Sequence, residues 1–302
     1  MRWNKLNARR LGQYYGVVVD SPTDPLSNLR FADDVLLFSS SPSDAAKMIS
    51  DLKNEAAKFG LKLHMGKTVV LTNRAVGRPA TISCAGQDIK VASPDDTEKY
   101  LGRKLSISAY HHTEFGNRLA SAWAAFFKSK EVFCNKKVPL ADRIKLFECT
   151  VTPCMLYACG SWTLTKDMER KLSTTKRRML RWIVGVPRLP QEQWTEYIQR
   201  ATHRIEDLSR QHGATDWVLL QRTRKFNAAG KAALSTDGRW SHRLLKWRPW
   251  FRVPAYRNVG RPHKRWDDDL VAVAGESWPE ATGDSAAWSA LREAYIYVRA
   301  AA

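Results

Sequence analysis

The hydrophobic pattern of this chain changes its period once, near residue 113. Before that point the apolar residues fall in short runs separated by turn-forming residues, which is typical of β-strands, with one clear helix among them. From there to about residue 184 they recur at steps of three and four, which indicates helices. Strands and helices kept in separate stretches are typical of the α+β class. We therefore expect antiparallel strands with a packed helix, followed by a helical domain.

Several short segments of the first 110 residues are predicted to be strands. GVVVD (16–20) is rich in β-branched residues, and Pro22 and Pro25 make the following SPTDP a turn. The apolar runs on either side of Asp33 and Asp34 then form one β-hairpin with the two carboxylates at its tip. LKLHM and KTVVLTN are predicted to pair, and TISCAGQDIKVA and EKYLGRKLSIS to supply further short strands.

One helix with clear end signals is predicted in SPSDAAKMISDLKNEAAKFG. Ser41 is expected to cap its first turn, Pro42 takes the first helical position, and Gly60 follows its end. Its apolar positions recur at helical spacing and predict one buried face, made of Ala45, Met48, Ile49, Leu52, Ala56 and Phe59.

The charge of the chain is strongly unbalanced. It has 49 Lys plus Arg against 30 Asp plus Glu, a net charge of +19. Because cations that neutralise phosphates gain free energy from counterion release, this excess favours a nucleic-acid partner. The chain has no apolar run of the roughly 18 residues that a membrane span needs and no signal-peptide core at its start. We expect an intracellular protein, in the nucleus or the cytoplasm, without disulfides.

Three of the five cysteines are evenly spaced, at Cys149, Cys154 and Cys159. Zinc sites need close cysteine pairs or matched histidines, and neither occurs here. These cysteines are therefore predicted to be small buried hydrophobic residues.

The helix predicted in TKDMERKLSTTKRRMLRWIVG (165–185) combines an apolar stripe with many cations. Thr165 is its predicted N-cap and Gly185 its end. The stripe consists of Met168, Leu172, Met179 and Ile183. The remaining surface carries seven cations, which are Lys166, Arg170, Lys171, Lys176, Arg177, Arg178 and Arg181. Two acids cannot pair with all of them, so a helix that tracks phosphates is favoured over an ordinary solvated face.

The segment from 239 to 266 is rich in Arg and Trp, after a weakly periodic stretch at 190–238 without a trusted motif. It holds nine Arg or Lys, four Trp and no acid. Guanidinium groups bind phosphates and indoles stack on unpaired bases, although a helix with its Trp residues packed inward is an alternative. The predicted nucleic-acid contacts of the chain are Arg170, Lys171, Arg177, Arg178, Arg181, Arg243, Trp247, Arg248, Trp250, Arg252, Arg261, Lys264, Arg265 and Trp266.

The adjacent carboxylates of Asp33 and Asp34 repel each other at a hairpin tip. A divalent cation would reverse that penalty, and hard oxygen ligands suit Mg²⁺, which also bridges to phosphates. Two-metal phosphoryl transfer uses such carboxylates. An acidic β-turn in water is the alternative, but apolar strands on both sides predict a rigid and partly desolvated pair.

An ordered set of motifs resembles the reverse transcriptases of non-LTR retrotransposons (long interspersed elements). FADDVLLFS resembles their acidic signature, FGLKLHMGKTVVL the next palm motif, and EKYLGRKLS the primer grip. Residues 118–188 are similar throughout to the thumb of these enzymes, and LLKWRPWFR and GRPHKRWDDDL resemble the segment after it. The resemblance covers roughly residues 16–188 and, more weakly, 239–270.

This resemblance implies a palm, a thumb and a C-terminal region. They would be a partial palm at 1–110, a helical thumb at 111–188, and a basic Arg/Trp-rich region at 189–302. The implied reaction is Mg²⁺-dependent addition of deoxynucleoside triphosphates to a primer 3′-OH on an RNA template, so the implied partners are RNA, a DNA primer or target, and the nucleotide.

The resemblance also implies roles for single residues. Asp33 and Asp34 would bind metal, and Lys67 would lie near the triphosphate as a further catalytic residue. Tyr100, Leu101 and Gly102 would form a tight turn that holds the primer terminus. Where these enzymes usually carry Asn, this chain has His64.

One departure from the family concerns the metal site. These polymerases use a third Asp on an earlier strand, and Asp20 lies too close to Asp33 to leave room for the intervening motif. The fingers and half of the palm are thus expected to be absent, and the chain to have little or no polymerase activity. A non-catalytic nucleic-acid-binding module, a group II intron maturase or telomerase-like polymerase, and a product without function remain alternatives, although the thumb segment argues against the second.

Overall fold

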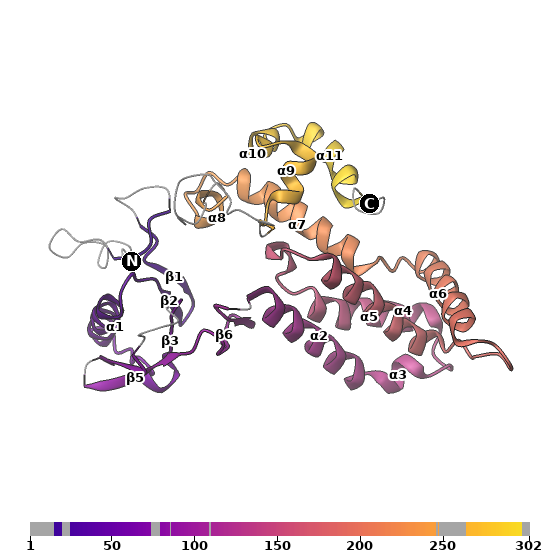
Figure 1. Ribbon diagram of the computed structural model, residues 1–302, viewed down its shortest axis with the longest axis horizontal. Coiled ribbons are helices and arrows are strands. Elements are labelled where there is room, and N and C mark those ends of the chain that lie inside the picture. Colours follow the sequence, from indigo (N-terminus) through magenta and orange to yellow (C-terminus); the bar gives the residue numbers. More distant parts are fainter. Residues whose placement is uncertain are drawn as a thin grey trace. The chain divides into compact units, whose positions relative to one another are not determined.

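The structure of the protein is a computed structural model. It describes residues 15–19, 25–73, 79–84, 86–108, 110–245, 247 and 264–297. The chain divides into two compact units (Figure 1). Unit 1 holds residues 1–114 and 238–255, and unit 2 holds residues 115–237 and 256–302. Strands occur in the first part of the chain and helices in the rest, so the predicted α+β class is confirmed. Among the described helices, none has the length and apolar composition of a membrane span.

In its described residues, unit 1 has three small sheets, a packed helix and a second, short helix. Its elements are β1 (Asn28–Phe31), β2 (Asp34–Leu37), α1 (Pro42–Ala57), a 3₁₀ turn (Met65–Lys67), β3 (Val70–Leu71), β4 (Thr81–Cys84), β5 (Gln87–Ala92), β6 (Glu98–Tyr100), β7 (Arg103–Leu105) and α8 (Trp240–Arg243). The pairs β1–β2 and β6–β7 are antiparallel hairpins. In the third sheet β5 is central, antiparallel to β4 and parallel to β3.

Helix α1 covers the three-stranded sheet and begins as predicted. The Ser41 side chain accepts a hydrogen bond from the Asp44 N–H at 3.1 Å, and Pro42 is the first helical residue. Ile49 packs with Ile82 and other apolar residues of β4 and β5 to form the core of unit 1. The prediction of the buried face is wrong for Phe59, which follows the end of the helix and is 56% exposed.

Two strand predictions in unit 1 are corrected by the structure. Residues 61–73 do not form a hairpin, because a 3₁₀ turn occupies Met65–Lys67 and β3 pairs with the distant β5 instead. In the described residues 15–19 there is an isolated bridge between Val17 and Leu26 and not a full strand. Asp20 lies outside the described residues.

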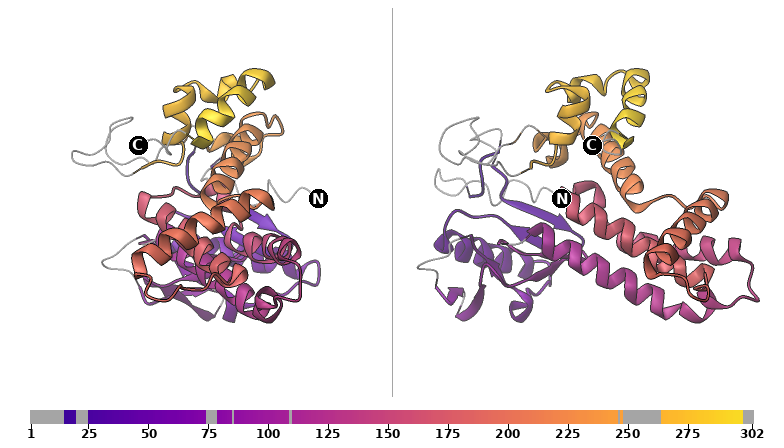
Figure 2. Two further views of the ribbon diagram at one scale, coloured as in Figure 1. Left: turned by 90° about the vertical axis from the view of Figure 1, so that its right-hand side faces the viewer. Right: turned by 45° about the vertical axis from the view of Figure 1, so that its right-hand side comes forward.

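Unit 2 is a group of helices around one large core. Its elements are α2 (Tyr110–Lys128, in unit 2 from residue 115 on), α3 (Lys130–Cys134), α4 (Leu140–Met155), a 3₁₀ turn (Cys159–Ser161), α5 (Lys166–Val184), α6 (Trp194–Gln211), α7 (Trp217–Ala233), α9 (Asp268–Ala274), α10 (Trp278–Ala281) and α11 (Ser285–Tyr297). Helix α5 packs against α3, α4, α6 and α7 (Figure 2). The helical pattern predicted from residue 113 to 184 is therefore confirmed.

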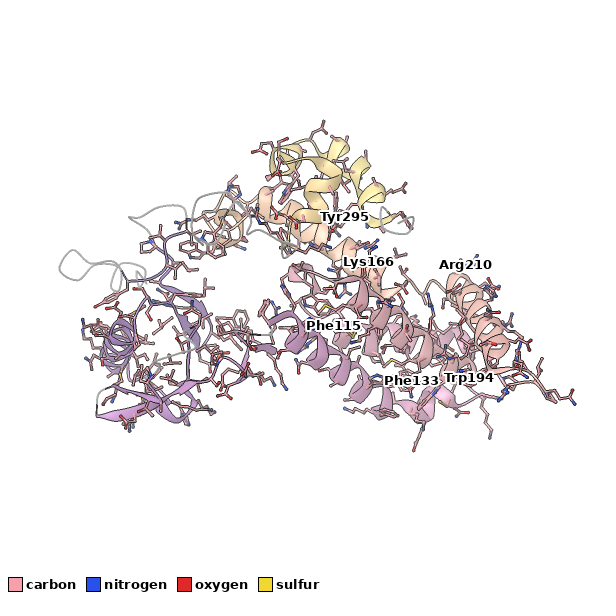
Figure 3. All side chains as sticks on the ribbon, in the orientation of Figure 1. Phe115, Phe133, Lys166, Trp194, Arg210 and Tyr295 are labelled. Atoms are coloured by element: carbon pink, nitrogen blue, oxygen red, sulfur yellow. The ribbon has the colours of Figure 1, made fainter. Side chains whose placement is uncertain are left out.

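The core of unit 2 crosses the boundary predicted at residue 188. Phe115 and Phe133, labelled in Figure 3, share this core with Ile205 of α6 and Trp217 of α7. Helices from both sides of residue 188 therefore bury their apolar faces together. The separation of a thumb at 111–188 from the residues after it stays a prediction.

A smaller aromatic group joins α7 to the last helices of unit 2. Phe226 stacks on Trp288 with ring centroids 4.1 Å apart, and Trp278 is 2% exposed beside them. Gly230 is required at this contact, because a Cβ there would lie only 2.7 Å from the Trp288 indole nitrogen.

Helix α5 has the predicted ends but not all of the predicted surface. Thr165 accepts a hydrogen bond from the Met168 N–H, and Gly185 ends the helix at a positive φ of 67°. The predicted apolar stripe is buried. Lys176, predicted to lie on the charged surface, is instead 3% exposed and paired with Glu148 of α4.

All five cysteines lie in the described part of the chain and are free thiols. Cys159 is buried, as predicted. The prediction is wrong for Cys149, which is exposed on α4, and Cys154 is only partly buried.

Candidate functional site

The acidic pair lies at the tip of the β1–β2 hairpin, as predicted. Phe31 pairs with Asp34, so Ala32 and Asp33 alone form the turn. Ala32 has a positive φ of 51°, a conformation that costs a residue with a Cβ about 1–2 kcal/mol. Asp33 and Asp34 are both exposed, which corrects the expectation of a partly desolvated pair. The carboxylates thus stand on a short, defined turn and are accessible to a ligand.

A second tight turn connects β6 and β7. Tyr100 pairs with Arg103, leaving Leu101 and Gly102 as a two-residue loop. Both have positive φ, 46° for Leu101 and 75° for Gly102, as a type I′ turn requires. Glycine adopts this conformation freely, but leucine does so at a cost, and such strain persists where the surrounding structure imposes it. The tight turn predicted at Tyr100–Gly102 is therefore present.

The charge of Asp34, beside the first turn, acts on Tyr100, beside the second. Tyr100 is partly buried, and burial raises the pKa of its phenol group. The negative charge of Asp34 raises that pKa further, so the Asp34 carboxylate lies close enough for its field to act on Tyr100. Two predicted site residues that are far apart in the sequence thus interact electrostatically in the fold.

The β6–β7 hairpin is held by the start of α2. Glu114, 2% exposed, accepts a hydrogen bond from the Lys104 N–H at 2.7 Å and lies 3.8 Å from the Arg103 guanidinium. Arg103 also donates to the Tyr110 hydroxyl at 2.9 Å. Sequence reasoning missed this anchor, because no local pattern marks Glu114 as a partner of β7.

Lys67 occupies the last position of the 3₁₀ turn Met65–Lys67, and its side chain is exposed. Its N–H donates to the carbonyl of His64, which also accepts from the Thr68 hydroxyl. Within the described residues, Lys67 forms no ion pair with Asp33. Its predicted role near a triphosphate stays a prediction.

The acidic hairpin fits Mg²⁺ only in part. The carboxylate oxygens of Asp33 and Asp34 are hard ligands of the kind that Mg²⁺ prefers. In the described ranges, however, no group of three or more His, Cys, Asp or Glu side chains is placed to hold a metal ion. Water and nucleic-acid phosphates would have to supply the remaining ligands.

Helix α5 presents most of its cations along one side. Arg170, Arg177 and Arg181 recur at helical spacing, and Lys171 and Arg178 form the neighbouring row. Arg170 and Lys171 share Asp167 at 3.2 and 3.3 Å. These pairs are on the surface, where an ion pair contributes about 0–1 kcal/mol, so phosphates can replace them.

The other cations of α5 have partners from neighbouring helices. The Arg177 guanidinium lies 3.4 Å from Glu206 of α6. Arg178 is exposed, with its guanidinium 5.5 Å from the ring centre of Trp123. Burial lowers the pKa of Arg181, the nearby Tyr197 opposes this, and the charges of Arg178 and Arg177 add to it. Burial is thus the main cause of the lowered pKa of Arg181, and the neighbouring cations add to it.

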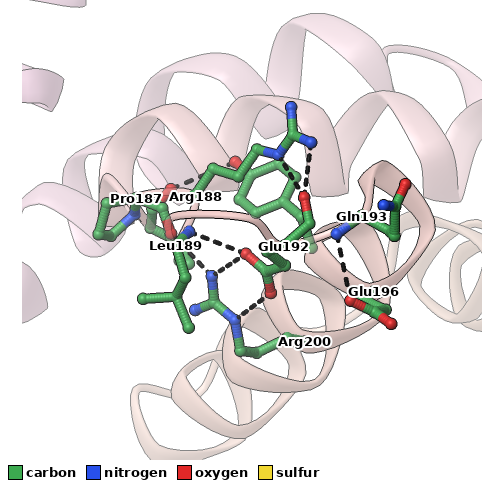
Figure 4. A network of polar contacts seen from close by, with 9 residues as sticks. Pro187, Arg188, Leu189, Glu192, Gln193, Glu196 and Arg200 are labelled. Carbon is green, nitrogen blue, oxygen red and sulfur yellow. Dashed lines mark hydrogen bonds and ion pairs between the residues drawn. The ribbon is translucent and has the colours of Figure 1, made fainter.

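The connection between α5 and α6 is tightly organised (Figure 4). The Glu192 carboxylate accepts hydrogen bonds from the Arg200 guanidinium at 2.7 and 2.8 Å and from the Leu189 N–H at 2.9 Å. Arg200 and the other donors hold the pKa of the Glu192 carboxyl at about 2. Arg188 donates to the Glu192 carbonyl, and Gln191 adopts a φ of 64°. This network sets where α6, and with it Glu206, meets α5.

Comparison with known proteins identifies the origin of the chain. No protein-family model and no solved structure matches it. A transposon-derived protein of Caenorhabditis elegans, itself uncharacterized, is 33% identical over 250 residues, which are 81% of this chain and 84% of the worm protein. The chain belongs to this family of transposon-derived proteins. The transposable-element origin that the motifs imply is thus confirmed, and the assignment to reverse transcriptases stays a prediction.

The C-terminal contacts predicted for this transposon-derived protein are only partly described. Arg248, Trp250, Arg252 and Arg261 lie outside the described residues. In α8, the Arg243 guanidinium lies 3.8 Å from the ring centre of Trp240, and Trp247, a few residues on, is partly buried.

Three further predicted contacts, Lys264, Arg265 and Trp266, lie in the next described stretch, and two of them have partners within unit 2. The Trp266 indole donates to the Gly160 carbonyl at 2.9 Å, and its ring packs edge-on against Trp278. Lys264 pairs with Asp269 at 2.7 Å. Trp266 and Lys264 therefore have structural roles. For Trp266 this agrees with the alternative in which the Trp residues pack inward. The Arg265 side chain is half-buried, and its N–H donates to Asp268.

The same transposon-derived chain contains a cavity of about 300 Å³ in unit 2, with Lys225, Lys264 and Asp269 in its wall. Lys225 is 2% exposed, and its ammonium lies 3.7 Å from Asp269. Burial lowers the pKa of Lys225 to about 8, Asp269 opposes the shift, and Lys264 adds to it. The folded protein thus holds the charged form of this lysine at a cost.

Lys225→Met is expected to make the protein more stable at pH 7, by about 1–3 kcal/mol. The substitution removes a buried charge, while Asp269 still has Lys264 as its ion-pair partner. An unfolded lysine has a pKa near 10.4. Between pH 8 and that value the unfolded chain therefore binds a proton that the folded protein does not, and wild-type stability rises. Chemical unfolding from pH 7 to 10.5 should show this rise in the wild type and not in Lys225→Met. Lys264→Met is the control, and a loss of stability in Lys225→Met comparable to the control's would contradict the interpretation.

Proposed function

We propose that this transposon-derived chain is part of a reverse transcriptase of the non-LTR retrotransposon type. The reaction would be the addition of deoxynucleotides to a primer 3′-OH opposite an RNA template. The observation that supports this most is the electrostatic effect of Asp34, beside one strained turn of unit 1, on Tyr100, beside the other. A polymerase palm needs metal-binding carboxylates close to the group that holds the primer end, and the effect of Asp34 on Tyr100 supports such a relation.

Each part of the proposed site has a distinct task. Asp33 and Asp34 would hold metal ions on the hairpin tip, and the Tyr100–Gly102 turn would position the primer terminus. Bound there, Mg²⁺ would neutralise the charge that develops on the transferring phosphoryl group. Lys67 would contact the triphosphate. Helix α5 of unit 2 would bind the backbone of the primer–template through its exposed cations.

Because the hairpin tip offers two carboxylates, those of Asp33 and Asp34, we expect this chain to bind metal weakly by itself. Phosphates of a bound primer–template would add ligands, so metal binding and nucleic-acid binding should reinforce each other. For the same reason, we expect incorporation of nucleotides by this chain to be slow or undetectable.

Metal binding tests the proposal without relying on activity. Mn²⁺, added to the 302-residue chain, should be bound weakly alone and at least several-fold more tightly with an RNA template annealed to a DNA primer. The Asp33→Asn, Asp34→Asn double variant should lose this gain, since it removes both charges and keeps the shapes. Water-proton relaxation of Mn²⁺ measures both. An unchanged Mn²⁺ affinity in the double variant would contradict a metal role for the hairpin, and primer extension on a homopolymer template would report any residual activity.

A non-catalytic nucleic-acid-binding module is the second candidate. It is favoured by the cations of α5, whose exposure does not depend on the acidic hairpin. In that case RNA binding would be salt-sensitive, equal in the wild type and the double variant, and indifferent to Mn²⁺.

A further inference from the structure

Three aromatic side chains from α2 and α5 form a continuous patch in unit 2. They are Trp123 and Phe127 of α2 and Trp182 of α5, and we call them the aromatic patch. Phe127 is 53% exposed, whereas the two tryptophans are half-buried against the core. A single exposed phenylalanine is ordinary, but one joined to two indoles makes a larger exposed apolar surface.

The rings of the patch support one another. Trp123 and Phe127, one helical turn apart, stack with centroids 5.6 Å apart and planes at 27°. Trp182 meets both edge-on, at 6.2 Å from Trp123 and 5.9 Å from Phe127. The exposed Phe127 ring is thus held on a base of two indoles, and little side-chain entropy remains to be lost when another ring stacks on it.

Cations flank the patch on two sides. Arg178 of α5 lies over Trp123 at 5.5 Å. Lys130 of α3 lies 5.0 Å from the ring centre of Trp182 and 6.0 Å from that of Phe127. Both cations are exposed, and Arg178 belongs to the cationic rows of α5. An aromatic surface bordered by exposed cations is complementary to a base with its neighbouring phosphates.

We propose that the aromatic patch binds an unpaired base of single-stranded nucleic acid, which stacks on Phe127 while Arg178 and Lys130 contact the flanking phosphates. The inference rests on the proposed function in that nucleic acid is the partner. A second copy of this chain is a poorer occupant, since a symmetric contact would bring Arg178 and Lys130 toward their own copies. Helix α5 would hold the backbone, and the patch would hold a base at its C-terminal end.

The experiment compares two oligonucleotides with the same number of phosphates. One is an oligo(dT), and the other carries abasic sites in place of its central thymidines. Wild-type protein should bind the oligo(dT) about tenfold more tightly, the gain expected from stacking one base. Phe127→Leu keeps an apolar side chain and removes the ring, so it should abolish the preference without weakening binding to the abasic strand. Phe127→Tyr keeps the ring and should retain the preference.

Phe59→Leu is the matched control, because Phe59 is 56% exposed and belongs to unit 1. It should keep the tenfold preference of the wild type, and thermal unfolding should confirm that all variants fold. Equal binding of both strands by the wild type would overturn the patch and leave the proposed function standing. Binding of neither strand would also overturn the patch, while the Mn²⁺ experiment with annealed primer–template tests the proposed function separately. A change of oligomeric state in Phe127→Leu with an unchanged preference would overturn the patch in favour of a protein contact.

Discussion

Replacing Arg170, Lys171 and Arg177 together with alanine is expected to weaken nucleic-acid binding about a hundredfold at 0.1 M salt. Each cation that neutralises a phosphate contributes about 0.9 to the slope of log affinity against log salt on a duplex, and about 0.7 on a single strand. The loss of three such contacts should therefore lower the slope by about two to three units.

The three side chains are suited to this test because they are accessible and weakly held. Their exposed fractions are 78% for Arg170, 61% for Lys171 and 40% for Arg177. Their ion pairs with Asp167 and Glu206 are surface pairs, so their loss should change the free energy of unfolding by about 1 kcal/mol or less per pair. Binding should fall while stability is nearly kept.

Fluorescence anisotropy with labelled RNA and DNA, repeated over a range of salt concentrations, measures both the affinity and the slope. The matched control removes the same charge from other helices of unit 2, by replacing Arg204, Arg210 and Lys231 with alanine. If the control weakens binding as much as the α5 variant, then net charge and not the α5 surface carries the interaction.

The sequence predicted best those features whose causes are local. The β1–β2 hairpin follows from apolar runs on either side of a two-residue turn, and the ends of α5 from a capping Thr165 and a Gly185 that tolerates positive φ. Each of these is decided by residues within one turn or one hairpin, so a single sequence contains the information.

The features that were missed depend on contacts between distant residues. β3 pairs with β5, some twenty positions later, and no pattern in residues 61–73 specifies that partner. The apolar pattern of helix α7 in the sequence is weak, because the helix buries polar side chains such as Gln221, Arg222 and Lys225. Their partners come from other segments, for example the Cys159 carbonyl for Gln221. The predicted surface position of Lys176 is wrong for the same reason, because its partner Glu148 lies on another helix.

Lys176→Met is expected to lower the free energy of unfolding by about 3–5 kcal/mol, because it leaves one side of a buried ion pair without its partner. The Lys176 ammonium donates to the Glu148 carboxylate and, at 2.6 Å, to the Thr215 carbonyl. The Glu148 carboxylate also accepts from the Thr152 hydroxyl at 2.8 Å, which in turn accepts from the Trp217 indole at 2.8 Å. Chemical unfolding followed by tryptophan fluorescence measures the loss.

The double variant Lys176→Met, Glu148→Leu separates the two contributions to this loss. If the cost comes mainly from an unpaired carboxylate, removing Glu148 as well should restore most of the stability, since a buried ion pair replaced by apolar side chains is often neutral. A double variant less stable than Lys176→Met would mean that the network itself stabilises α4 against α5. The contrast with Lys225 has a structural cause. Asp269 keeps Lys264 when Lys225 is lost, whereas Lys176 is the lysine that holds Glu148, so two buried lysines of one unit are expected to respond with opposite signs.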